Sequence, residues 1–199
     1  MRFFSGLPTV ALIVFAWLAL AVPLGQTLLF DIAVRDHIHD WASPPLTAVM
    51  LSVTEMGEPL FLAIVTLSIA WPLAVKGGKR QVLKLAVATL TALLADELLK
   101  LLFHRIRPAA FFGYLEPASY SFPSGHAMLS TCYYGLLAAI LAARIQARAG
   151  RAVLWAAGVI LVAAIGFSRL YLGVHYATDV IAGYALGIVW IAGAGRVSF

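Results

Sequence analysis

The 199-residue sequence is poor in charge and in cysteine. Charged residues make up 12% of the chain and hydrophobic residues 62%, with a mean hydropathy of +0.94. Soluble domains carry about 25% charged and about 45–50% apolar residues, so this composition excludes an ordinary soluble domain. The single cysteine, Cys132, lies in an apolar run. A disulfide framework and a cysteine-based zinc site are therefore excluded, and we expect Cys132 to serve packing.

The sequence contains several long apolar segments with few or no charged residues. Residues 3–30 contain no charged side chain, and a bilayer span needs roughly 20 mostly apolar residues. The sequence predicts an all-α fold, with residues 1–199 as a single domain built on a bundle of six transmembrane helices. The expected spans are Leu7–Leu29, Pro59–Val75, Val82–Phe103, Ala127–Ala143, Ala152–Phe167 and His175–Ala194.

The first forty residues contain two further signals. Arg2 precedes an apolar run with a weak cleavage pattern at Ala19-Leu20-Ala21, as in a signal peptide. This run continues beyond the roughly 7–15 residues of a signal-peptide core, so we expect a retained helix. Apolar and charged residues then mingle from Asp31 to Trp41, which predicts a short interfacial helix after the first span.

Basic residues divide unevenly between the two sides of this predicted bundle. With the N-terminus inside, nine of the fourteen fall on the cytoplasmic side: Arg2, Lys76, Lys79, Arg80, Lys84, Arg144, Arg148, Arg151 and Arg196. The other five fall outside, with all nine acidic residues. The positive-inside rule therefore predicts cytoplasmic termini in what we take to be a bacterial inner membrane. Because the net charge of +5 is dispersed over short loops, we expect no nucleic-acid partner.

Three short stretches at the predicted outer ends of the spans carry a candidate phosphate cradle. Lys100, Arg107 and Arg169 supply positive charge, and each arginine can bind two oxygens at once. Ser124 and Gly125 open the fourth span, where free N–H groups and the helix dipole favour an anion. Phosphoryl transfer depends mainly on such positioning and charge. We therefore expect a phosphate ester as substrate, with no metal and no other cofactor.

Two histidines complete the predicted site. His175 and Asp179 lie four residues apart at the start of the sixth span, so the carboxylate can hold one ring nitrogen and aim the other. This spacing predicts His175 as the nucleophile. His126, on another helix, is the candidate for protonating the leaving oxygen and then activating water. The remaining histidines match no motif and are expected on the surface: His37, His39 and His104.

Together the three stretches resemble the signature motifs of the type-2 phosphatidic acid phosphatase family, membrane lipid phosphatases related to the vanadium haloperoxidases. Eleven fixed identities occur in the family's order, from Lys100 to Asp179. The resemblance implies a six-helix bundle with its site on the outer side, and metal-free hydrolysis of a lipid phosphate through a phosphohistidine. It implies the same roles for the two histidines. Undecaprenyl diphosphate and phosphatidylglycerol phosphate are the favoured substrates, ahead of phosphatidic acid and lipid A phosphates.

Other interpretations remain open. The motifs suit equally a phosphotransferase that passes the phosphoryl group to a second lipid. Charges within spans also occur in transporters and flippases, although the sequence has no evident inverted repeat or matched pair of broken spans.

The roles of several individual residues also remain open. Lys100 has a possible partner in Asp96, one turn earlier, while Arg105 either assists the cradle or binds headgroups. The aromatic loop from residue 104 to residue 123 either anchors the membrane interface or grips a lipid. We expect headgroup selectivity in residues 109–122 of this loop and in the grooves between the spans. No role or recognisable metal-ligand spacing is assigned to four acidic residues: Glu55, Glu58, Asp96 and Glu97.

Overall fold

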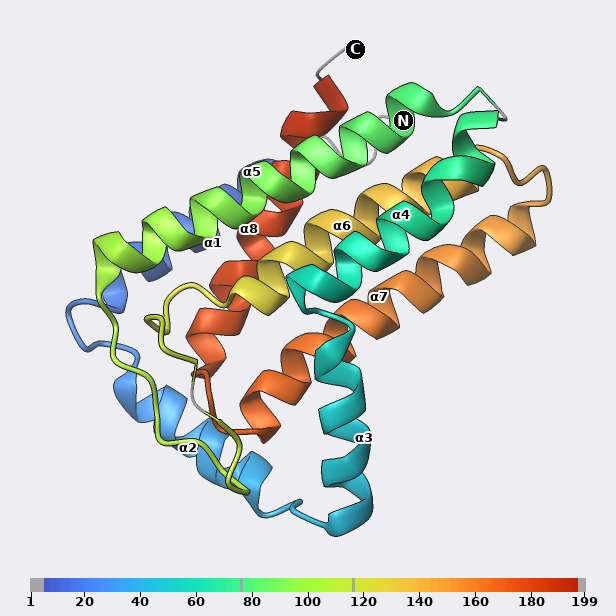
Figure 1. The fold of residues 1–199 in the computed structure, drawn as a ribbon. Helices are drawn as coiled ribbons and strands as arrows, with labels where there is room; N and C mark the ends of the chain where they lie inside the picture. Colours follow the sequence, from blue (N-terminus) through green and yellow to red (C-terminus); the bar gives the residue numbers. More distant parts are fainter. Residues whose placement is uncertain (1–5, 76, 116, 197–199) are drawn as a thin grey trace.

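The computed structural model describes residues 6–75, 77–115 and 117–196, which form eight helices and no strand (Figure 1). Arg2, Lys76 and Glu116 lie outside the described residues, as does the side chain of Arg196. The helices are α1 (Leu7–Ala21), α2 (Leu28–His39), α3 (Pro44–Glu55), α4 (Pro59–Val75), α5 (Lys79–Phe103), α6 (Gly125–Ala142), α7 (Arg148–Tyr171) and α8 (Ala177–Arg196). The all-α prediction is confirmed.

The predicted first span is wrong in its length. We expected one helix from Leu7 to Leu29, but α1 ends at Ala21 and α2 begins at Leu28. The chain turns between them, and Gly25 adopts a positive φ of 69° that glycine tolerates without strain. The interfacial helix expected from Asp31 to Trp41 therefore starts earlier, within the apolar run.

Fewer than six helices meet simple criteria for a membrane span among the described residues. α6, α7 and α8 are long and apolar enough to cross a membrane, and α3 with α4 forms a fourth candidate that is bent by 60°. α1 is apolar but has 15 residues, and α5 carries charged residues near both ends. The expectation of six spans is thus supported only in part, while the expectation of membrane-spanning helices holds.

The bend between α3 and α4 was not predicted. α3 begins after Ser43 with Pro44 in its first turn, a helix start that the sequence signals and that we did not use. The Tyr134 hydroxyl of α6 donates to the Met56 carbonyl at 2.8 Å, which ties the bend to the bundle centre.

α6 lies at the centre of the bundle, where most of its residues are buried and α5, α7 and α8 pack around it (Figure 1). Glycines let α8 approach it closely. A Cβ atom at Gly183 would lie 2.5 Å from the Ser124 carbonyl oxygen, and one at Gly187 would lie 2.5 Å from the Thr131 Cβ. The starts of α6 and α8 are therefore held together.

The outer faces of α1, α4 and α7 expose large apolar side chains, which suits contact with lipid. Examples are Ile13, Trp17, Leu67, Trp71, Val153 and Ile160. The α4–α5 and α6–α7 turns lie at one end of the bundle with the end of α8, whereas α2, α3 and the α5–α6 loop lie at the other (Figure 1). The basic residues Lys79, Arg80, Arg144 and Arg148 belong to the first of these ends.

Candidate active site

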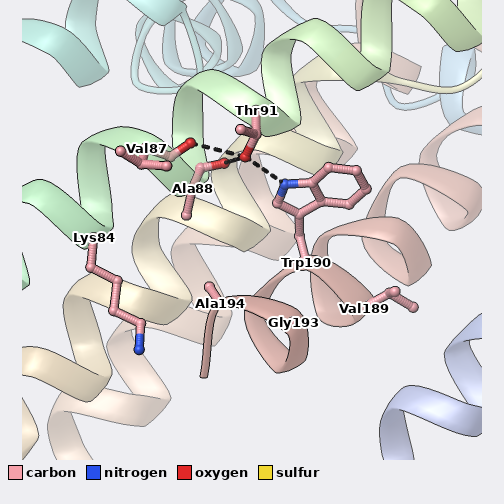
Figure 2. Close-up of a pocket in the computed structure, with 8 residues that line it drawn as sticks. All are labelled: Lys84, Val87, Ala88, Thr91, Val189, Trp190, Gly193 and Ala194. Carbon is pink, nitrogen blue, oxygen red and sulfur yellow. Dashed lines mark hydrogen bonds between the residues drawn. The ribbon is translucent and has the colours of Figure 1, made fainter. Parts of the chain in front are cut away.

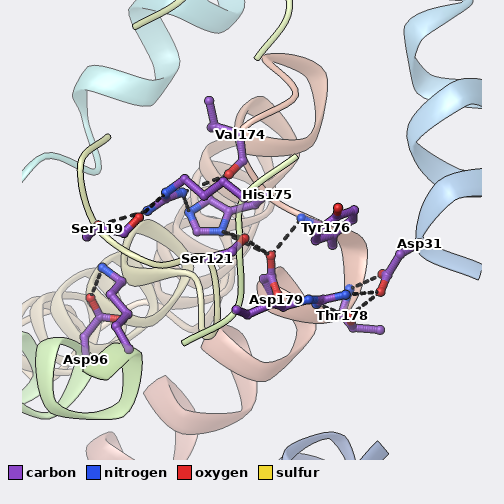
Figure 3. Close-up of polar contacts among 12 residues, drawn as sticks. Asp31, Asp96, Ser119, Ser121, Val174, His175, Tyr176, Thr178 and Asp179 are labelled. Atoms are coloured by element: carbon purple, nitrogen blue, oxygen red, sulfur yellow. Dashed lines mark hydrogen bonds and ion pairs between the residues drawn. The ribbon is translucent and has the colours of Figure 1, made fainter. Parts of the chain in front are cut away.

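All three motif stretches meet at the end of the bundle where α5 and α7 finish and α6 and α8 begin (Figure 1). We expected His175 to lie on the helix of the sixth span. It lies just before that helix, because α8 starts at Ala177. Its side chain is 2% exposed. The four-residue spacing nevertheless brings the Asp179 carboxylate to the ring, because Nδ1 of His175 lies 3.4 Å from Oδ2 of Asp179 (Figure 3).

The contacts of His175 define its tautomer. Its Nε2 lies 2.9 Å from Nη1 of Arg107. A guanidinium has N–H donors and no acceptor, so Nε2 must accept and must carry a lone pair. In the neutral ring the proton therefore sits on Nδ1, which faces the Asp179 carboxylate and, at 3.4 Å, the Ser121 hydroxyl.

The surroundings of His175 favour the neutral ring. Burial, together with the charges of Arg107, Arg169 and Lys100, lowers the pKa of His175 well below 6.5. Burial and the neighbouring Arg169 also lower the pKa of Arg107, to about 10, so that Arg107 stays charged at neutral pH. Three cations thus surround an uncharged imidazole whose Nε2 keeps its lone pair at neutral pH.

Arg107 is fixed by the loop before α6 and by the backbone beside His175. Its Nε donates to the Ser119 carbonyl at 2.7 Å, its Nη2 to the Ser119 hydroxyl at 3.1 Å, and its Nη1 to the Val174 carbonyl at 2.8 Å. Figure 3 shows three of these partners, Ser119, Val174 and His175, close to one another. Serines of the aromatic loop are therefore part of the site, a role that sequence reasoning missed.

The carboxylate of Asp179 is fully buried and has several donors. It accepts from the Ser121 hydroxyl and from Nη1 of Arg105, each at 2.5 Å, and from the Tyr176 amide at 2.8 Å. Nη2 of Arg105 donates to Asp31 at 2.7 Å. The partners of Arg105 are therefore the carboxylates behind His175, a contact that neither of the two roles left open for it had included.

Lys100 does pair with Asp96, at 2.6 Å, and lies 3.2 Å from Glu97 Oε1. It also lies against the start of α6, where a Cβ atom at Gly125 would be 3.2 Å from the Lys100 ammonium and 2.5 Å from Asp96 Oδ2. Glycine is the residue that leaves room here. The ion pair considered as an alternative for Lys100 is therefore present, and it sits at the helix N-terminus of the candidate cradle.

Ser124 is the N-cap residue of α6. Its amide donates to the Asp179 carbonyl at 3.0 Å, which joins the second motif to the third. Its hydroxyl is buried and has no protein hydrogen-bond partner. A buried polar atom without a partner costs free energy, so this hydroxyl is available to a bound ligand.

Arg169 and His126 lie against the bend between α3 and α4. Arg169 is 1% exposed, and its Nη1 donates to the Thr54 hydroxyl at 2.6 Å and to Tyr114 at 3.2 Å. Its Nε is buried without a partner. Nε2 of His126 lies 3.1 Å from Glu58 Oε1. Thr54 and Glu58 were missed because nothing in their local sequence indicates residues more than 60 positions away.

Two minor expectations, on Cys132 and on the histidines outside the motifs, can be checked directly. Cys132 is fully buried, as expected of a packing residue, and its thiol faces the Ala88 carbonyl at 3.8 Å. The three histidines outside the motifs are exposed, as predicted: His37, His39 and His104. Among the described residues, no group of three or more His, Cys, Asp or Glu side chains is arranged to hold a metal ion.

A separate groove of about 440 Å³ lies between α5 and α8 (Figure 2). Within it, the Trp190 indole donates to the Thr91 hydroxyl at 3.0 Å, and Lys84 lies at one side. It contains none of the motif residues and lies toward the opposite end of α5. The groove is therefore not the place where these residues can act on a phosphate.

Comparison with known proteins supports one family. A model of the PAP2 superfamily matches residues 81–198. Phosphatidylglycerophosphatase B of Bacillus subtilis (strain 168) is 31% identical over 184 residues, which cover 92% of this chain and 90% of that protein. An undecaprenyl-diphosphatase of Sulfolobus acidocaldarius is 28% identical over 172 residues, which cover 84% and 77% respectively.

A solved structure agrees with these relatives. The crystal structure of a transmembrane PAP2-type phosphatidylglycerolphosphate phosphatase from Bacillus subtilis matches with a TM-score of 0.89 and 27% identity, over 96% of this chain and 94% of that one. The relatives are named as phosphatases, and homology to them identifies this chain as a lipid phosphate hydrolase. Since the family model covers well over half of its residues, the chain belongs to the PAP2 superfamily.

Proposed function

We propose that this chain removes phosphate from a lipid phosphate monoester or diphosphate through a phosphohistidine at His175. The observation that carries this proposal is the buried Nε2 lone pair of His175, which lies among cations while Nδ1 faces Asp179. A neutral imidazole is the nucleophilic form, and a carboxylate behind it stabilises the charge that develops on attack.

In the proposed first step, Nε2 attacks phosphorus, a P–N bond forms, and the bond from phosphorus to the leaving oxygen breaks. His126 gives the leaving oxygen a proton. In the second step His126 takes a proton from water, whose oxygen attacks phosphorus as the P–N bond breaks. Inorganic phosphate leaves, and His175 returns to the neutral ring with its proton on Nδ1.

The cradle in this proposal consists of Lys100, Arg107, Arg169 and the N-terminus of α6 at Ser124 and Gly125. Two buried groups without protein partners, the Ser124 hydroxyl and Nε of Arg169, are donors that phosphate oxygens would satisfy. The Arg107 contact to Nε2 would be exchanged for a phosphate oxygen when substrate binds, which frees the lone pair for attack.

Phosphatidylglycerol phosphate is the first candidate substrate, and undecaprenyl diphosphate the second. The Bacillus subtilis relatives named for the first match more than nine-tenths of this chain, at 31% and 27% identity. The diphosphatase match is 28% identical and covers 84% of the chain. In both cases the site would face the outer side of a bacterial inner membrane, in a six-span bundle with cytoplasmic termini, because the basic turns lie at the far end.

The test is free phosphate release by the purified protein in detergent, with no membrane gradient. The panel contains phosphatidylglycerol phosphate, undecaprenyl diphosphate, phosphatidic acid and a lipid A phosphate, with and without an acceptor lipid. His175→Ala should abolish release, whereas Arg144→Ala, at the opposite end, should not alter it. Activity in His175→Ala would contradict the phosphohistidine, and phosphate transfer to the acceptor in place of release would identify a phosphotransferase.

Orientation is tested separately by cysteine labelling in a Cys132→Ala background. Ala109→Cys lies in the α5–α6 loop and Ala147→Cys in the α6–α7 turn, and both positions are exposed. A membrane-impermeant maleimide added to intact spheroplasts should label residue 109 and leave residue 147 unlabelled. The reverse pattern would place the site on the cytoplasmic side.

A further inference from the structure

An arginine outside the proposed cradle connects the nucleophile to helix α2. Arg105 donates through Nη1 to Asp179 Oδ1 at 2.5 Å and through Nη2 to Asp31 Oδ2 at 2.7 Å. One guanidinium therefore bridges two carboxylates, one on α8 and one on α2. Figure 3 shows Asp31 and Asp179 near each other, with His175 on the other side of Asp179.

Asp31 is built into this contact. Its side chain is fully buried, and it accepts from the Thr178 amide at 2.9 Å, the Thr178 hydroxyl at 2.8 Å and the Thr27 hydroxyl at 3.1 Å. Thr178 belongs to the first turn of α8, where free amides and the helix dipole favour a negative charge. Asp31 therefore holds both Arg105 and the start of the helix that follows His175.

Arg105 is itself held in place by the site. Its carbonyl accepts from the Ser121 amide at 2.8 Å, and its guanidinium carbon lies 4.2 Å from the centre of the Tyr176 ring. Burial disfavours the charge on Arg105, but Asp179 and Asp31 outweigh it and raise the pKa of Arg105. The guanidinium is thus a permanent cation that a buried carboxylate needs, because a buried charge without its partner is costly.

We propose that Arg105 and Asp31 are positioning residues for the reaction. Asp31 holds Arg105, and Arg105 holds the Asp179 carboxylate toward Nδ1 of His175. This inference rests on the proposed function, in which His175 is the nucleophile. In that scheme neither residue touches the phosphate, so their loss should slow turnover while leaving phosphate binding in the cradle intact.

The test compares kcat, KM and competitive inhibition by vanadate in purified full-length variants. Arg105→Gln should lower kcat by about 10-fold to 100-fold, by analogy with the loss of groups that orient metal ligands. KM and the vanadate inhibition constant should stay within about twofold of wild type. Arg105→Lys keeps the charge without the fork and should recover part of the lost turnover.

Coupling distinguishes this mechanism from general destabilisation. Asp31→Asn keeps an oxygen that can accept from the Thr178 amide but loses the charge that holds Arg105, so it should lower kcat through Arg105. The double variant Asp31→Asn/Arg105→Gln should therefore be no slower than Arg105→Gln alone. Asp36→Asn is the matched control, since Asp36 is exposed on the same helix, and should retain wild-type kcat.

Three results would overturn the inference: wild-type turnover in Arg105→Gln, additive losses in the double variant, or vanadate binding that weakens in parallel with kcat. If Arg105→Gln does not fold, Arg105→Lys and Asp31→Asn decide by the same comparison of kcat with vanadate inhibition. His175→Ala is measured in the same series. Activity in His175→Ala would overturn the proposed function. If His175→Ala is inactive while the Arg105 and Asp31 variants keep wild-type turnover, this inference alone is overturned.

Discussion

Gly57 lies directly against the ring of His126. A Cβ atom at residue 57 would be 2.8 Å from Cδ2 of the imidazole and 2.7 Å from Cγ2 of Ile165. Contacts this short between carbon atoms force neighbouring groups to move. The hydrogen bond from the Tyr134 hydroxyl to the Met56 carbonyl opposes a movement of the α3–α4 bend away from His126. Glycine at this position therefore lets the bend support His126 at close range.

We expect Gly57→Ala to lower phosphate release by about 10-fold or more, because a misplacement of about 1 Å in a catalytic group can cost 10²-fold. Gly158→Ala is the matched control, since its Cβ atom would meet only the Ala138 Cβ at 3.9 Å. Measurement of kcat together with the thermal midpoint separates displacement of His126 from unfolding. Equal activity in the two variants would mean that the bend does not position His126.

The lowered pKa of His175 predicts the pH dependence of kcat/KM. In the proposed mechanism, protonation of Nε2 removes the attacking lone pair, so activity should fall as the pH drops through the pKa of His175. Because burial, Arg107 and Arg169 hold that pKa below 6.5, the acid limb should lie below pH 6.5. Arg107→Gln removes one depressing charge and should move the limb to higher pH, whereas Arg144→Gln should not.

These profiles are measured with the free enzyme and dilute substrate over about pH 4 to 8, where kcat/KM reports groups of the free enzyme. A wild-type acid limb at or above pH 6.5 would be inconsistent with a buried neutral nucleophile. An unmoved limb in Arg107→Gln would mean that the charge on Arg107 does not control His175.

Local patterns predicted most of the helices, although not α3 or the break between α1 and α2, and they gave no indication of contacts between distant residues. The bounds of α4 follow from Pro59 and from the polar turn after Val75, and both agree with the structure. Asp31 and Arg105 are 74 residues apart, and Thr54 and Arg169 are 115 apart. Pairs of this kind arise from tertiary packing and leave no periodic signal in one sequence.

The break between α1 and α2 escaped prediction for another reason. Residues 22–27 carry no charge, although they include Pro23, Gln26 and Thr27, and the absence of charge alone continues the predicted helix through them. Gly25, in a left-handed conformation, was the available signal for a turn. The chain reversal at Gly25 directs α2 across the end of the bundle that holds the candidate site. The first turn of α2 then places Asp31 beside Arg105.

Removal of divalent metal ions should leave the activity intact. In the proposed cradle, the positive charge that a phosphoryl group needs comes from Lys100, Arg107, Arg169 and the N-terminus of α6. Phosphate release should therefore be the same with and without EDTA. Loss of activity in EDTA with recovery on added magnesium would instead assign ligand roles to acidic residues such as Asp96, Glu97 or Glu116, the last of which lies outside the described residues.

The shape of the arginine side chain, beyond its charge, should govern inhibition by vanadate. Vanadate has the tetrahedral oxygens of phosphate, and in the proposed cradle Arg107 and Arg169 bind them as planar forks, whereas lysine provides a single point charge. Arg107→Lys and Arg169→Lys should each raise the inhibition constant by about 10-fold, as expected for the loss of one charge-assisted hydrogen bond. Arg144→Lys and Arg148→Lys, at the opposite end of the bundle, should leave it unchanged. Equal sensitivity of all four variants, or none in any, would mean that the cradle has been assigned to the wrong residues.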